Sequence, residues 1–512
     1  MTGLVPDIAF RPTLPELLHR AAERYGDNDY VVLPHRRISF AEAERASREL
    51  ARRLVAAGVA KGTRVGIILP TGIDWVVAWL AAGRIGAMPM LFPATYRPAE
   101  LQRTLRISDA DILLAPEQLL GKDYETFLEQ AVPGLAEHKG GPLRLVPLPF
   151  LRSIWMLGGR CTWAHHVDLD EPGPQDISDE LLAAIESEVS PSDPLLVIYT
   201  SGSSADPKAV VHTHGATVRK VQAELGMCLP GSLPGRTFSA MPFFWVGGPQ
   251  NLLGALHSGA AVVTQERFDA DEAVELLVRE RCTSILGWPT VLEKIQMHPR
   301  FASCELSSLP DPADIPLSSK GDLRNVGMTE TFGPHANRKY FDYRIVDPHS
   351  GRELPDGEEG EFCVRGFGLM ASMYKREREE VFDADGYYHT GDRCYVENDN
   401  VWFKGRFTEM VKVGGANVAP LEVEKLLESY PEVKMAFVIG VDDQQAGQIV
   451  AAVVVPIDGA AIDTDVLRTR ANTQLSAYKV PTRWLVLTER QVPSLGSGKP
   501  DKRAMRTLFA EC

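Results

Sequence analysis

The sequence predicts an α/β protein: a large amino-terminal domain of doubly wound sheets with a β-rich subdomain, then a small α+β carboxyl-terminal domain. Two patterns along the chain support this. Helical and extended patterns alternate through the first third, which is typical of parallel sheets covered by helices. From about residue 344, apolar and polar residues alternate between Gly, Asp and Asn turns, which indicates antiparallel hairpins.

The helix and strand signals of the first third are well separated. The segment 39–58 begins with Ser39 and Glu42 at capping-box spacing and continues with helical periodicity. The elements expected after it are a strand at 63–70, a helix near 74–87, a strand at 87–92, a helix from about Pro98 and a strand at 110–115. Ligands of such sheets bind at the carboxyl ends of strands, so the loops that follow strands are candidate sites.

A second domain is predicted after residue 408. The elements expected there are a helix at 420–430, strands at 434–441 and 449–457, a helix at 464–475 and a strand at 483–489. A unit of about 100 residues is large enough to fold separately. We therefore divide the chain into residues 1–408 and 409–512.

Composition excludes several classes of protein. The formal net charge of −14 over 512 residues argues against general nucleic-acid binding, which depends on clustered Lys and Arg. The apolar run 75–92 is interrupted by Arg84 and Pro89 and is not expected to span a membrane. The seven cysteines include no C-x-x-C pair, which suits a reducing compartment and gives no metal framework. The start of the chain carries no signal-peptide pattern, so we expect a cytoplasmic protein; its oligomeric state is not indicated.

The loop between Thr200 and Lys208 is rich in hydroxyls and small residues. It follows Leu195–Tyr199, an apolar run predicted to be a buried strand. Small residues let the backbone approach an anion, and successive N–H and O–H groups can surround phosphate oxygens. A solvated Ser/Gly turn would have the same composition, and the loop residues alone leave both interpretations open.

Six separated motifs, in the same order along the chain, resemble those of the adenylate-forming enzymes. This family includes acyl-CoA synthetases, peptide-synthetase adenylation domains and beetle luciferases. The motifs are YTSGSSADPK at 199–208, GMTE at 327–330, TGD at 390–392, KGRF at 404–407, VGGANVAP at 413–420 and SGK at 497–499. Alone, each charged residue among them would be interpreted as a turn or surface residue; their joint occurrence indicates the family. The resemblance implies a large adenylation domain with a small mobile carboxyl-terminal domain.

The resemblance also implies roles for individual residues. Lys499, Glu330 and Thr200 are expected to be catalytic, with ATP as the nucleotide and Mg²⁺ bound by Glu330. Further nucleotide contacts are implied for Ser201, Gly202, Ser203, Ser204, Lys208, Asn325, Thr329, Asp392 and Arg406. Gly414 and Gly415 match the loop that lines the family's pantetheine tunnel, and Glu409 matches its hinge. His212, His214 and His389 are possible acid–base groups for which the sequence shows no partner.

The segment MPFFWVGGPQ at 241–250 resembles the acyl-pocket helix of the family. Amino-acid adenylating members usually place an Asp where this chain has Phe244, and an unpaired buried ammonium would be costly. An apolar carboxylic acid, fatty or related, is therefore favoured, although core packing would explain the same aromatics. The expected acyl-pocket residues are Phe244, Trp245, Val246, Gly247, Gly327 and Met328.

The chain departs from the family pattern at three places. Val326 stands where an aromatic residue is usual before the GMTE motif. Glycine-rich elements usual near 309–316 and 336–340 are absent. Either the chain is abbreviated there or the sequence omits segments; we favour omission, because both losses spare every catalytic residue.

The reaction implied by the resemblance has two steps. A carboxylic acid and ATP give an acyl-adenylate and pyrophosphate, and a thiol then displaces AMP. Coenzyme A is the expected thiol, with the phosphopantetheine arm of an acyl-carrier protein as a second candidate. A fatty-acyl-AMP ligase is a further alternative, and a luciferase-like oxygenase is a weaker one. The alternative from another class is a catalytically silent protein that binds a nucleotide or an acyl-adenylate, against which the intact charged residues of the motifs argue.

Overall fold

The computed structural model describes residues 5–200, 207–225, 235–301, 323–324, 327–333, 340–398, 400–407, 410–443, 446–457, 460–493 and 500–509. The chain divides into two compact units. The first comprises Met1–Ala94, Thr104–Tyr199 and Ala209–Gly405, and the second comprises Thr95–Arg103, Thr200–Lys208 and Arg406–Cys512.

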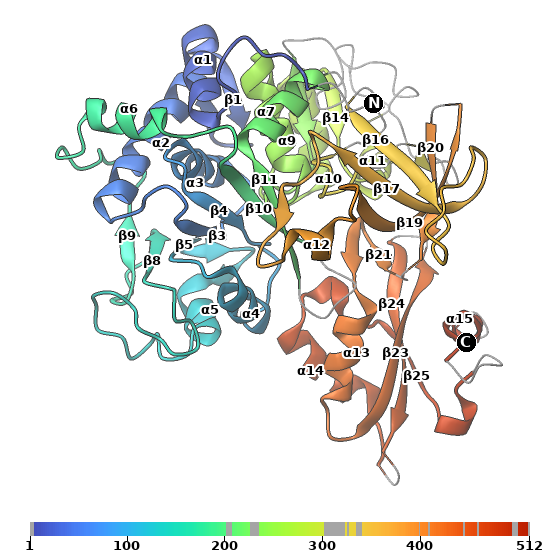
Figure 1. Ribbon diagram of the computed structural model, residues 1–512. Helices are drawn as coiled ribbons and strands as arrows, with labels where there is room; N and C mark the ends of the chain where they lie inside the picture. Colours follow the sequence, from blue (N-terminus) through green and yellow to red (C-terminus); the bar gives the residue numbers. More distant parts are fainter. Residues whose placement is uncertain are drawn as a thin grey trace. The chain divides into compact units, whose positions relative to one another are not determined.

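Helices and strands alternate through the first unit, as the sequence predicts (Figure 1). The helices that begin in this unit, together with α4, are α1 (Leu14–Tyr25), α2 (Phe40–Ala56), α3 (Ile73–Arg84), α4 (Pro98–Ser108), α5 (Tyr124–Ala131), α6 (Asp179–Ser187), α7 (His214–Ala223), α9 (Gly247–Ser258), α10 (Ala270–Arg279), α11 (Pro289–Gln296) and α12 (Arg378–Val381). The capping box expected for α2 is present, because Ser39 Oγ accepts the N–H of Glu42 and the Glu42 carboxylate accepts the N–H of Ser39.

Two sheets of the first unit are mainly parallel. The eight-stranded sheet has the order β18-β11-β10-β4-β3-β5-β8-β9, formed by β18 (Ser372–Met373), β11 (Lys208–Thr213), β10 (Pro194–Thr200), β4 (Met88–Leu91), β3 (Arg64–Ile67), β5 (Ile112–Pro116), β8 (Ser153–Leu157) and β9 (His165–Val167). A five-stranded sheet has the order β14-β12-β13-β1-β2, formed by β14 (Ser284–Leu286), β12 (Arg236–Ser239), β13 (Ala261–Val263), β1 (Asp29–Val32) and β2 (Arg37–Ser39). A short hairpin pairs β6 (Gln118–Leu119) with β7 (Lys122–Asp123).

A layer of helices contacts both of these sheets. Helix α3 packs on β3 and β4 of the eight-stranded sheet, whereas α2 and α9 pack on β1 and β13 of the five-stranded sheet. Helix α1 contacts α2, α3 and α9. Helix α3 is apolar around most of its circumference and nearly all of its residues are buried, as expected for a helix with packed neighbours on several sides. The expectation of doubly wound sheets is confirmed.

The third sheet of the first unit is the predicted β-rich subdomain. Its order is β15-β20-β19-β17-β16, formed by β15 (Leu323–Arg324), β20 (Asn400–Arg406), β19 (Tyr388–Glu397), β17 (Gly360–Gly366) and β16 (Phe341–Val346). The pairs β16–β17 and β17–β19 are antiparallel. The buried residues of β19 alternate with partly or fully exposed ones, so the period-two pattern of the sequence reflects one face packed on a core.

The second unit has its own five-stranded sheet and its own core. The sheet has the order β22-β21-β24-β23, formed by β22 (Ala416–Val418), β21 (Val411–Val413), β24 (Gly447–Pro456) and β23 (Val433–Asp443). Strand β25 (Arg483–Val486) is parallel to β24. The helical elements are α13 (Pro420–Glu428), α14 (Thr464–Gln474), α15 (Lys502–Leu508) and two 3-10 turns, η2 (Ala477–Lys479) and η3 (Glu489–Gln491). The expected α+β order is confirmed; α15 is an addition that the sequence pattern does not predict.

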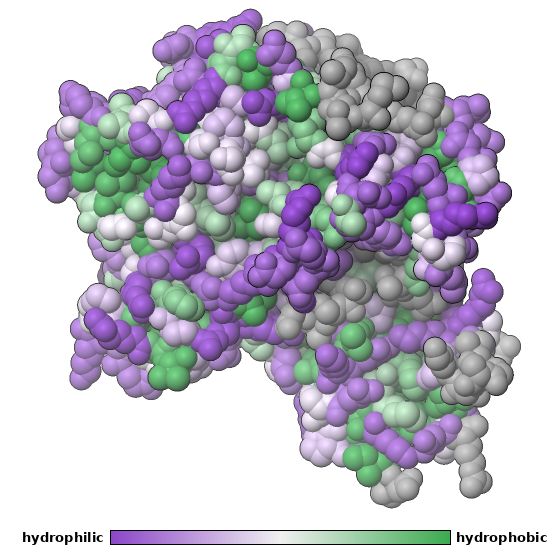
Figure 2. Space-filling view, in the orientation of Figure 1, coloured by the Kyte–Doolittle hydropathy of each residue, from purple (hydrophilic) through white to green (hydrophobic). Residues whose placement is uncertain are grey.

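None of the helices in the described part of the chain combines the length and the apolar character that a membrane crossing requires. Hydrophilic residues cover most of the face shown in Figure 2, with apolar patches scattered among them.

Candidate active site

Glu330 lies in a tight turn between Gly327 and Gly333. The backbones of Met328 and Gly333 exchange two hydrogen bonds, of 3.3 and 3.0 Å. Gly333 has a φ of +102°, and a Cβ placed there would lie 2.4 Å from a side-chain atom of Gln250 on α9. Only glycine fits this conformation and this close approach. The turn therefore lies against α9, whose first residues belong to the expected acyl-pocket segment.

Two neighbouring elements hold the backbone of this turn. The Nε2 of His212, on β11, lies 2.7 Å from the carbonyl oxygen of Thr329. Burial lowers the pKa of His212 to about 4, so the ring is neutral near pH 7 and its Nε2–H donates to that carbonyl. The N–H of Met370 donates to the carbonyl of Glu330 at 2.7 Å. His212 is thus a positioning residue of the turn.

The carboxylate of Glu330 is buried without a cation among the described residues. The residue is 8% exposed, and the hydroxyl of Tyr388 donates to Oε1 at 3.0 Å. Among the described residues, the Tyr388 hydroxyl is the only hydrogen-bond partner of the Glu330 carboxylate, and no ion pair includes that carboxylate. A buried charge needs compensation, and a carboxylate is the type of ligand that Mg²⁺ prefers. Glu330 therefore fits the expected metal position.

Strand β19 places Asp392 on the same face as Tyr388. The two residues and Thr390 between them alternate with more exposed neighbours, so all three side chains lie on one side of the strand. The Thr390 hydroxyl donates to the carbonyl of Phe362 at 2.7 Å and accepts the N–H of Asp392 at 3.0 Å. Tyr388 and Asp392 thus lie on the same face of β19, and Tyr388 bonds the carboxylate of Glu330 from that face.

Only the flanks of the loop 200–208, which is expected to bind phosphate, lie within the described residues. Leu195–Tyr199 lies in β10 and is buried, as predicted. Thr200 is the last residue of β10 and Lys208 is the first of β11. Ser201, Gly202, Ser203 and Ser204 lie outside the described residues, as do Asn325, Glu409 and Lys499. Arg406 ends β20, and its side chain also lies outside the description.

The expected acyl-pocket segment forms an aromatic cluster before α9. The ring of Phe244 lies 5.2 Å from that of Trp245, and Trp245 lies 6.0 Å from Trp288 at 80°. A Cβ on Gly247 would lie 2.3 Å from the Met241 side chain. Val246 precedes α9 as its N-cap residue. Gly327 and Met328 belong to the Glu330 turn, which α9 contacts through Gln250.

Trp288 is a member of this cluster that the sequence pattern does not indicate. It precedes α11, more than forty positions after Trp245, and no periodic pattern connects the two. Its indole Nε1 is buried and has no hydrogen-bond partner among the described residues. A buried donor of this kind can bind a polar group of a ligand. Trp288 is a further candidate for the acyl pocket.

In the second unit, Gly414 and Gly415 form the two-residue turn between β21 and β22. Both have positive φ, +55° and +92°, and Val413 pairs with Ala416 across the turn. Positive φ at both central residues is the type I′ hairpin turn, which favours Gly-Gly. The glycines are thus required by the backbone itself; their role in a thiol tunnel remains a prediction.

Lys479, in the segment YKVP, is engaged in ion pairs within the second unit. Its Nζ lies 2.6 Å from Glu100 and 3.1 Å from Glu422. Burial opposes the charge, yet Tyr478 and the two carboxylates keep the pKa of Lys479 above its usual value. Ser476 Oγ also donates to Glu100, at 2.6 Å. The sequence did not indicate this cluster, because Glu100 lies 379 positions before Lys479.

The two remaining candidate histidines also have structural partners. His214 accepts the N–H of Leu14 at 3.0 Å, and burial lowers its pKa to about 3. His389 lies between Glu361 and Asp383.

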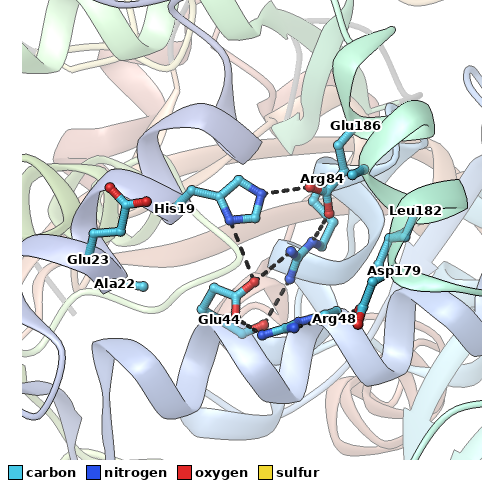
Figure 3. A pocket seen from close by; sticks show the side chains of 10 residues that line it. His19, Ala22, Glu23, Glu44, Arg48, Arg84, Asp179, Leu182 and Glu186 are labelled. Carbon is cyan, nitrogen blue, oxygen red and sulfur yellow. Dashed lines mark hydrogen bonds and ion pairs between the residues drawn. The ribbon is translucent and has the colours of Figure 1, made fainter.

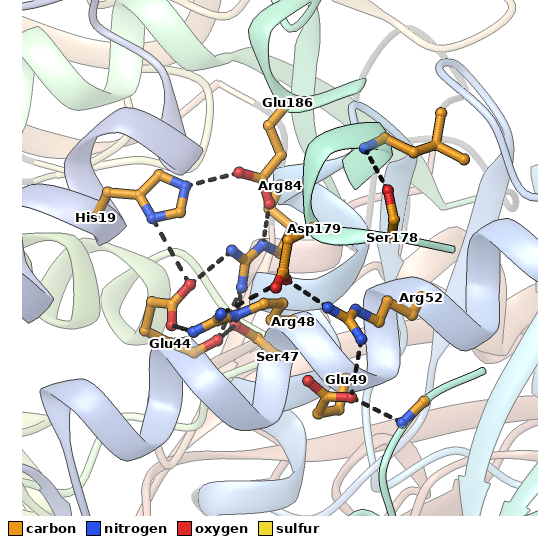
Figure 4. A network of polar contacts seen from close by, with 12 residues as sticks. His19, Glu44, Ser47, Arg48, Glu49, Arg52, Arg84, Ser178, Asp179 and Glu186 are labelled. Atoms are coloured by element: carbon orange, nitrogen blue, oxygen red, sulfur yellow. Dashed lines mark hydrogen bonds and ion pairs between the residues drawn. The ribbon is translucent and has the colours of Figure 1, made fainter. Parts of the chain in front are cut away.

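A polar pocket of about 460 Å³ lies away from the Glu330 turn, between α1, α2, α3 and α6 (Figure 3). Its charged groups pair with one another (Figure 4). Arg84, 1% exposed, binds the carboxylates of Glu44 and Glu186, and His19 Nε2 lies 2.6 Å from Glu186. Burial raises the pKa of Glu44, but Arg84 and Arg48 more than offset this and leave it below its usual value. The ion pairs of Arg84 with Glu44 and Glu186 stabilise the packing of these helices.

Comparison with known proteins agrees with this geometry. The family model described as AMP-binding enzyme matches residues 18–340, and the model described as AMP-binding enzyme C-terminal domain matches residues 422–499. The chain therefore belongs to the AMP-binding enzyme family, within its AMP-forming acid–CoA ligases.

Two curated relatives and one solved structure illustrate the similarity. The putative acyl-CoA synthetase YngI of Bacillus subtilis is 28% identical over 98% of this chain and 97% of its own. A feruloyl-CoA synthase of Amycolatopsis sp is 31% identical over 92% of this chain and 94% of its own. The amide bond synthetase McbA from Marinactinospora thermotolerans has the same fold, with a TM-score of 0.78, 24% identity and coverage of 96% of this chain and 99% of that chain.

Proposed function

We propose that this protein activates an apolar carboxylic acid with ATP and transfers the acyl group to the thiol of coenzyme A. In the first step, a carboxylate oxygen bonds to the α-phosphorus of ATP and pyrophosphate leaves. In the second step, the thiol attacks the acyl carbon, loses its proton, and AMP leaves. The product is an acyl thioester.

The observation that carries this proposal is the buried carboxylate of Glu330. Among the described residues, its negative charge is met only by the hydroxyl of Tyr388. Bringing a carboxylate to a phosphate costs on the order of 4 kcal/mol at 4 Å and an effective dielectric near 20. Bound Mg²⁺ would supply positive charge against this repulsion. No general base is needed, because the substrate acid is already ionised at neutral pH.

The chain's own residues set the rest of the geometry. His212 and the N–H of Met370 hold the turn that presents Glu330, and β19 presents Asp392, proposed to accept hydrogen bonds from the ribose hydroxyls. The loop 200–208 is proposed to hold the β- and γ-phosphates. Lys499 is proposed to add a cation during adenylation.

Three aromatic rings support an apolar acid as the substrate. The ring of Trp245 lies next to those of Phe244 and Trp288, and the segment 241–250 contains no charged residue. An amino acid would bring an ammonium group for which this segment offers no counter-charge. The relatives named above are a putative acyl-CoA synthetase and a feruloyl-CoA synthase, so both fatty and aryl acids belong in the substrate test.

The acceptor thiol is a separate part of the proposal. The Gly414–Gly415 turn presents backbone with no side chain, as a narrow pantetheine passage would require. An acyl-carrier protein would present the same phosphopantetheine arm. A luciferase-like oxygenase or a catalytically silent nucleotide binder would form no thioester.

The test is pyrophosphate release by the full-length protein with Mg²⁺ and ATP across a panel of acids. The panel contains saturated fatty acids of several lengths, hydroxycinnamates, arylacetates and free amino acids. We expect release with one apolar class, and a CoA thioester of that acid by mass spectrometry when CoA is added. Preference for an amino acid, or no release with any apolar acid, would contradict the proposal. Replacing CoA with a phosphopantetheinylated carrier protein distinguishes the two acceptors.

The mobile carboxyl-terminal domain is part of the same proposal. We place the boundary after residue 408 and the pivot at Glu409. Proline forbids most of the φ range that a hinge must sample, so Glu409→Pro should fix one domain arrangement. Adenylation needs one arrangement and the full cycle needs two, so acyl-adenylate should still form while thioester release is lost. Full turnover by Glu409→Pro would move the pivot elsewhere; Glu409→Ala is the control.

A further inference from the structure

Three side chains with different metal-binding atoms meet on the β-rich sheet. Glu361 and Cys363 lie two residues apart on β17, and His389 lies opposite Cys363 on the antiparallel strand β19. Their ligand atoms all lie within 4.8 Å of one another. This cluster, Glu361–Cys363–His389, is separate from the carboxylates of Glu330 and Asp392.

The distances within the cluster are close to those of a metal centre. His389 Nδ1 lies 3.0 Å from Glu361 Oε2 and 3.4 Å from Cys363 Sγ. Ligands of a tetrahedral zinc ion lie about 3.3 to 3.7 Å apart, given Zn–N and Zn–O bonds near 2.1 Å and a Zn–S bond near 2.3 Å. The two distances from His389 Nδ1 would therefore need to change by no more than about half an ångström to admit the ion.

Neighbouring groups orient these ligands. Asp383 Oδ2 lies 3.3 Å from His389 Nε2; a proton on Nε2 would direct the Nδ1 lone pair toward Glu361 and Cys363. The other oxygen of Glu361 accepts the N–H of Gly391 at 2.9 Å. A carboxylate behind the histidine and a held carboxylate ligand are the usual outer contacts of protein zinc sites. We propose that Glu361, Cys363 and His389 bind one zinc ion, with water completing the coordination.

Charge balance favours an occupied site. Zn²⁺ with a thiolate and a carboxylate is neutral, and Asp383 is already paired with Arg344. On binding, the Cys363 thiol loses its proton to solvent. The side chain of His389 is 41% exposed, which gives the ion a path of entry.

Donor type separates this site from the magnesium position. Thiolate and imidazole favour zinc, whereas Mg²⁺ prefers oxygen ligands alone. The sequence offered no C-x-x-C signal because the ligands come from two strands, in the patterns E-x-C and a distant His. The alternative is a metal-free cluster in which His389 is hydrogen-bonded to Glu361 and Asp383.

The test is metal binding by the full-length protein, freed of metal with a chelator and kept reduced. Zn²⁺ is added in buffer with excess Mg²⁺, which occupies oxygen sites, and bound zinc is counted after equilibrium dialysis. We expect one tightly bound zinc per chain. Co²⁺ in place of Zn²⁺ should show the thiolate-to-metal absorption band, a signature that surface carboxylates cannot give.

Variants assign the site. Cys363→Ser should remove the cobalt–thiolate band, whereas Cys394→Ser, which changes another buried cysteine of the same sheet, should retain it. Asp383→Asn should weaken zinc binding about 10- to 100-fold. Absence of the band in the wild-type protein, or a band that persists in both Cys363→Ser and His389→Gln, would overturn the proposal. The wild-type spectrum decides the matter even if a variant misfolds, and neither readout depends on ligase activity.

Discussion

Glu330 and the pair Glu44 and Glu186 are buried to nearly the same extent but have different partners. The three residues are 8%, 7% and 8% exposed. Glu44 and Glu186 share the guanidinium of Arg84, whereas Glu330 receives the neutral hydroxyl of Tyr388 within the described residues. Burial alone therefore does not identify a functional carboxylate. The difference is whether the chain supplies the counter-charge or leaves it to a ligand.

The largest effect is expected for Lys499→Ala, which removes the cation proposed to compensate the reacting anions beside Glu330. Adenylation should slow roughly a thousandfold, equivalent to about 4 kcal/mol. Thioester formation from supplied acyl-adenylate should continue at nearly the wild-type rate. Separate assays of the two half-reactions measure this, and an equal loss in both would make Lys499 a structural residue.

Arg84→Met tests the other side of the comparison, where the chain provides the counter-charge. Loss of one partner of a buried ion pair costs about 3 to 5 kcal/mol. We expect a loss near the lower end of that range, because Glu44 keeps Arg48 and Glu186 keeps His19. Urea unfolding measures this. The control Arg48→Met removes a more exposed cation (35% side-chain exposure) and should cost less than about 1 kcal/mol; equal losses would mean that Arg84 is not central to the network.

Glu330→Gln should have little effect on stability, unlike a change in the Arg84 network. The substitution is nearly isosteric and removes an uncompensated charge. The Mg²⁺ concentration for half-maximal adenylation should rise about tenfold, equivalent to about 1.4 kcal/mol. Magnesium titration of pyrophosphate release measures the change, and an unaltered titration would remove Glu330 from the metal site.

The smallest effect is expected for Tyr388→Phe, which removes the neutral partner of Glu330. A lost hydrogen bond costs about 1 kcal/mol, so the melting temperature should fall modestly without ligand. Magnesium–ATP should reduce the difference, because the metal then satisfies the carboxylate. Tyr387→Phe is the matched control: its hydroxyl donates to Asp342 at 2.9 Å, and its effect should not depend on magnesium–ATP.

Local features of this molecule were predictable from sequence. The capping box at Ser39 and the buried strand before Thr200 both follow from the spacing and type of the residues. The partners that give the site its character were not predictable. Tyr388 reaches Glu330 across 58 positions, and His212 reaches Thr329 across 117. No periodicity connects such residues, because their proximity is set by how strands are ordered in the sheets.

Trp245 and Trp288 are far apart in the sequence but close in space, and the order of strands in a sheet is again the cause. They meet because β12, β13 and β14 pair side by side and bring the segments that follow β12 and β14 together. The composition of 241–250 therefore predicted aromatic residues in this cluster but did not predict that Trp288 joins them.

The alternation of β19 limits how this part of the chain can change length in evolution. One face of the strand carries Tyr388 and Asp392, and the other carries His389. Deleting or inserting one residue between Tyr388 and Asp392 would reverse the faces of the strand residues that follow, turning Asp392 outward while Tyr388 stays in place. A length change after Glu397, the last residue of β19, would leave both faces in place. Related chains should therefore tolerate indels beyond Glu397 and not between Tyr388 and Asp392.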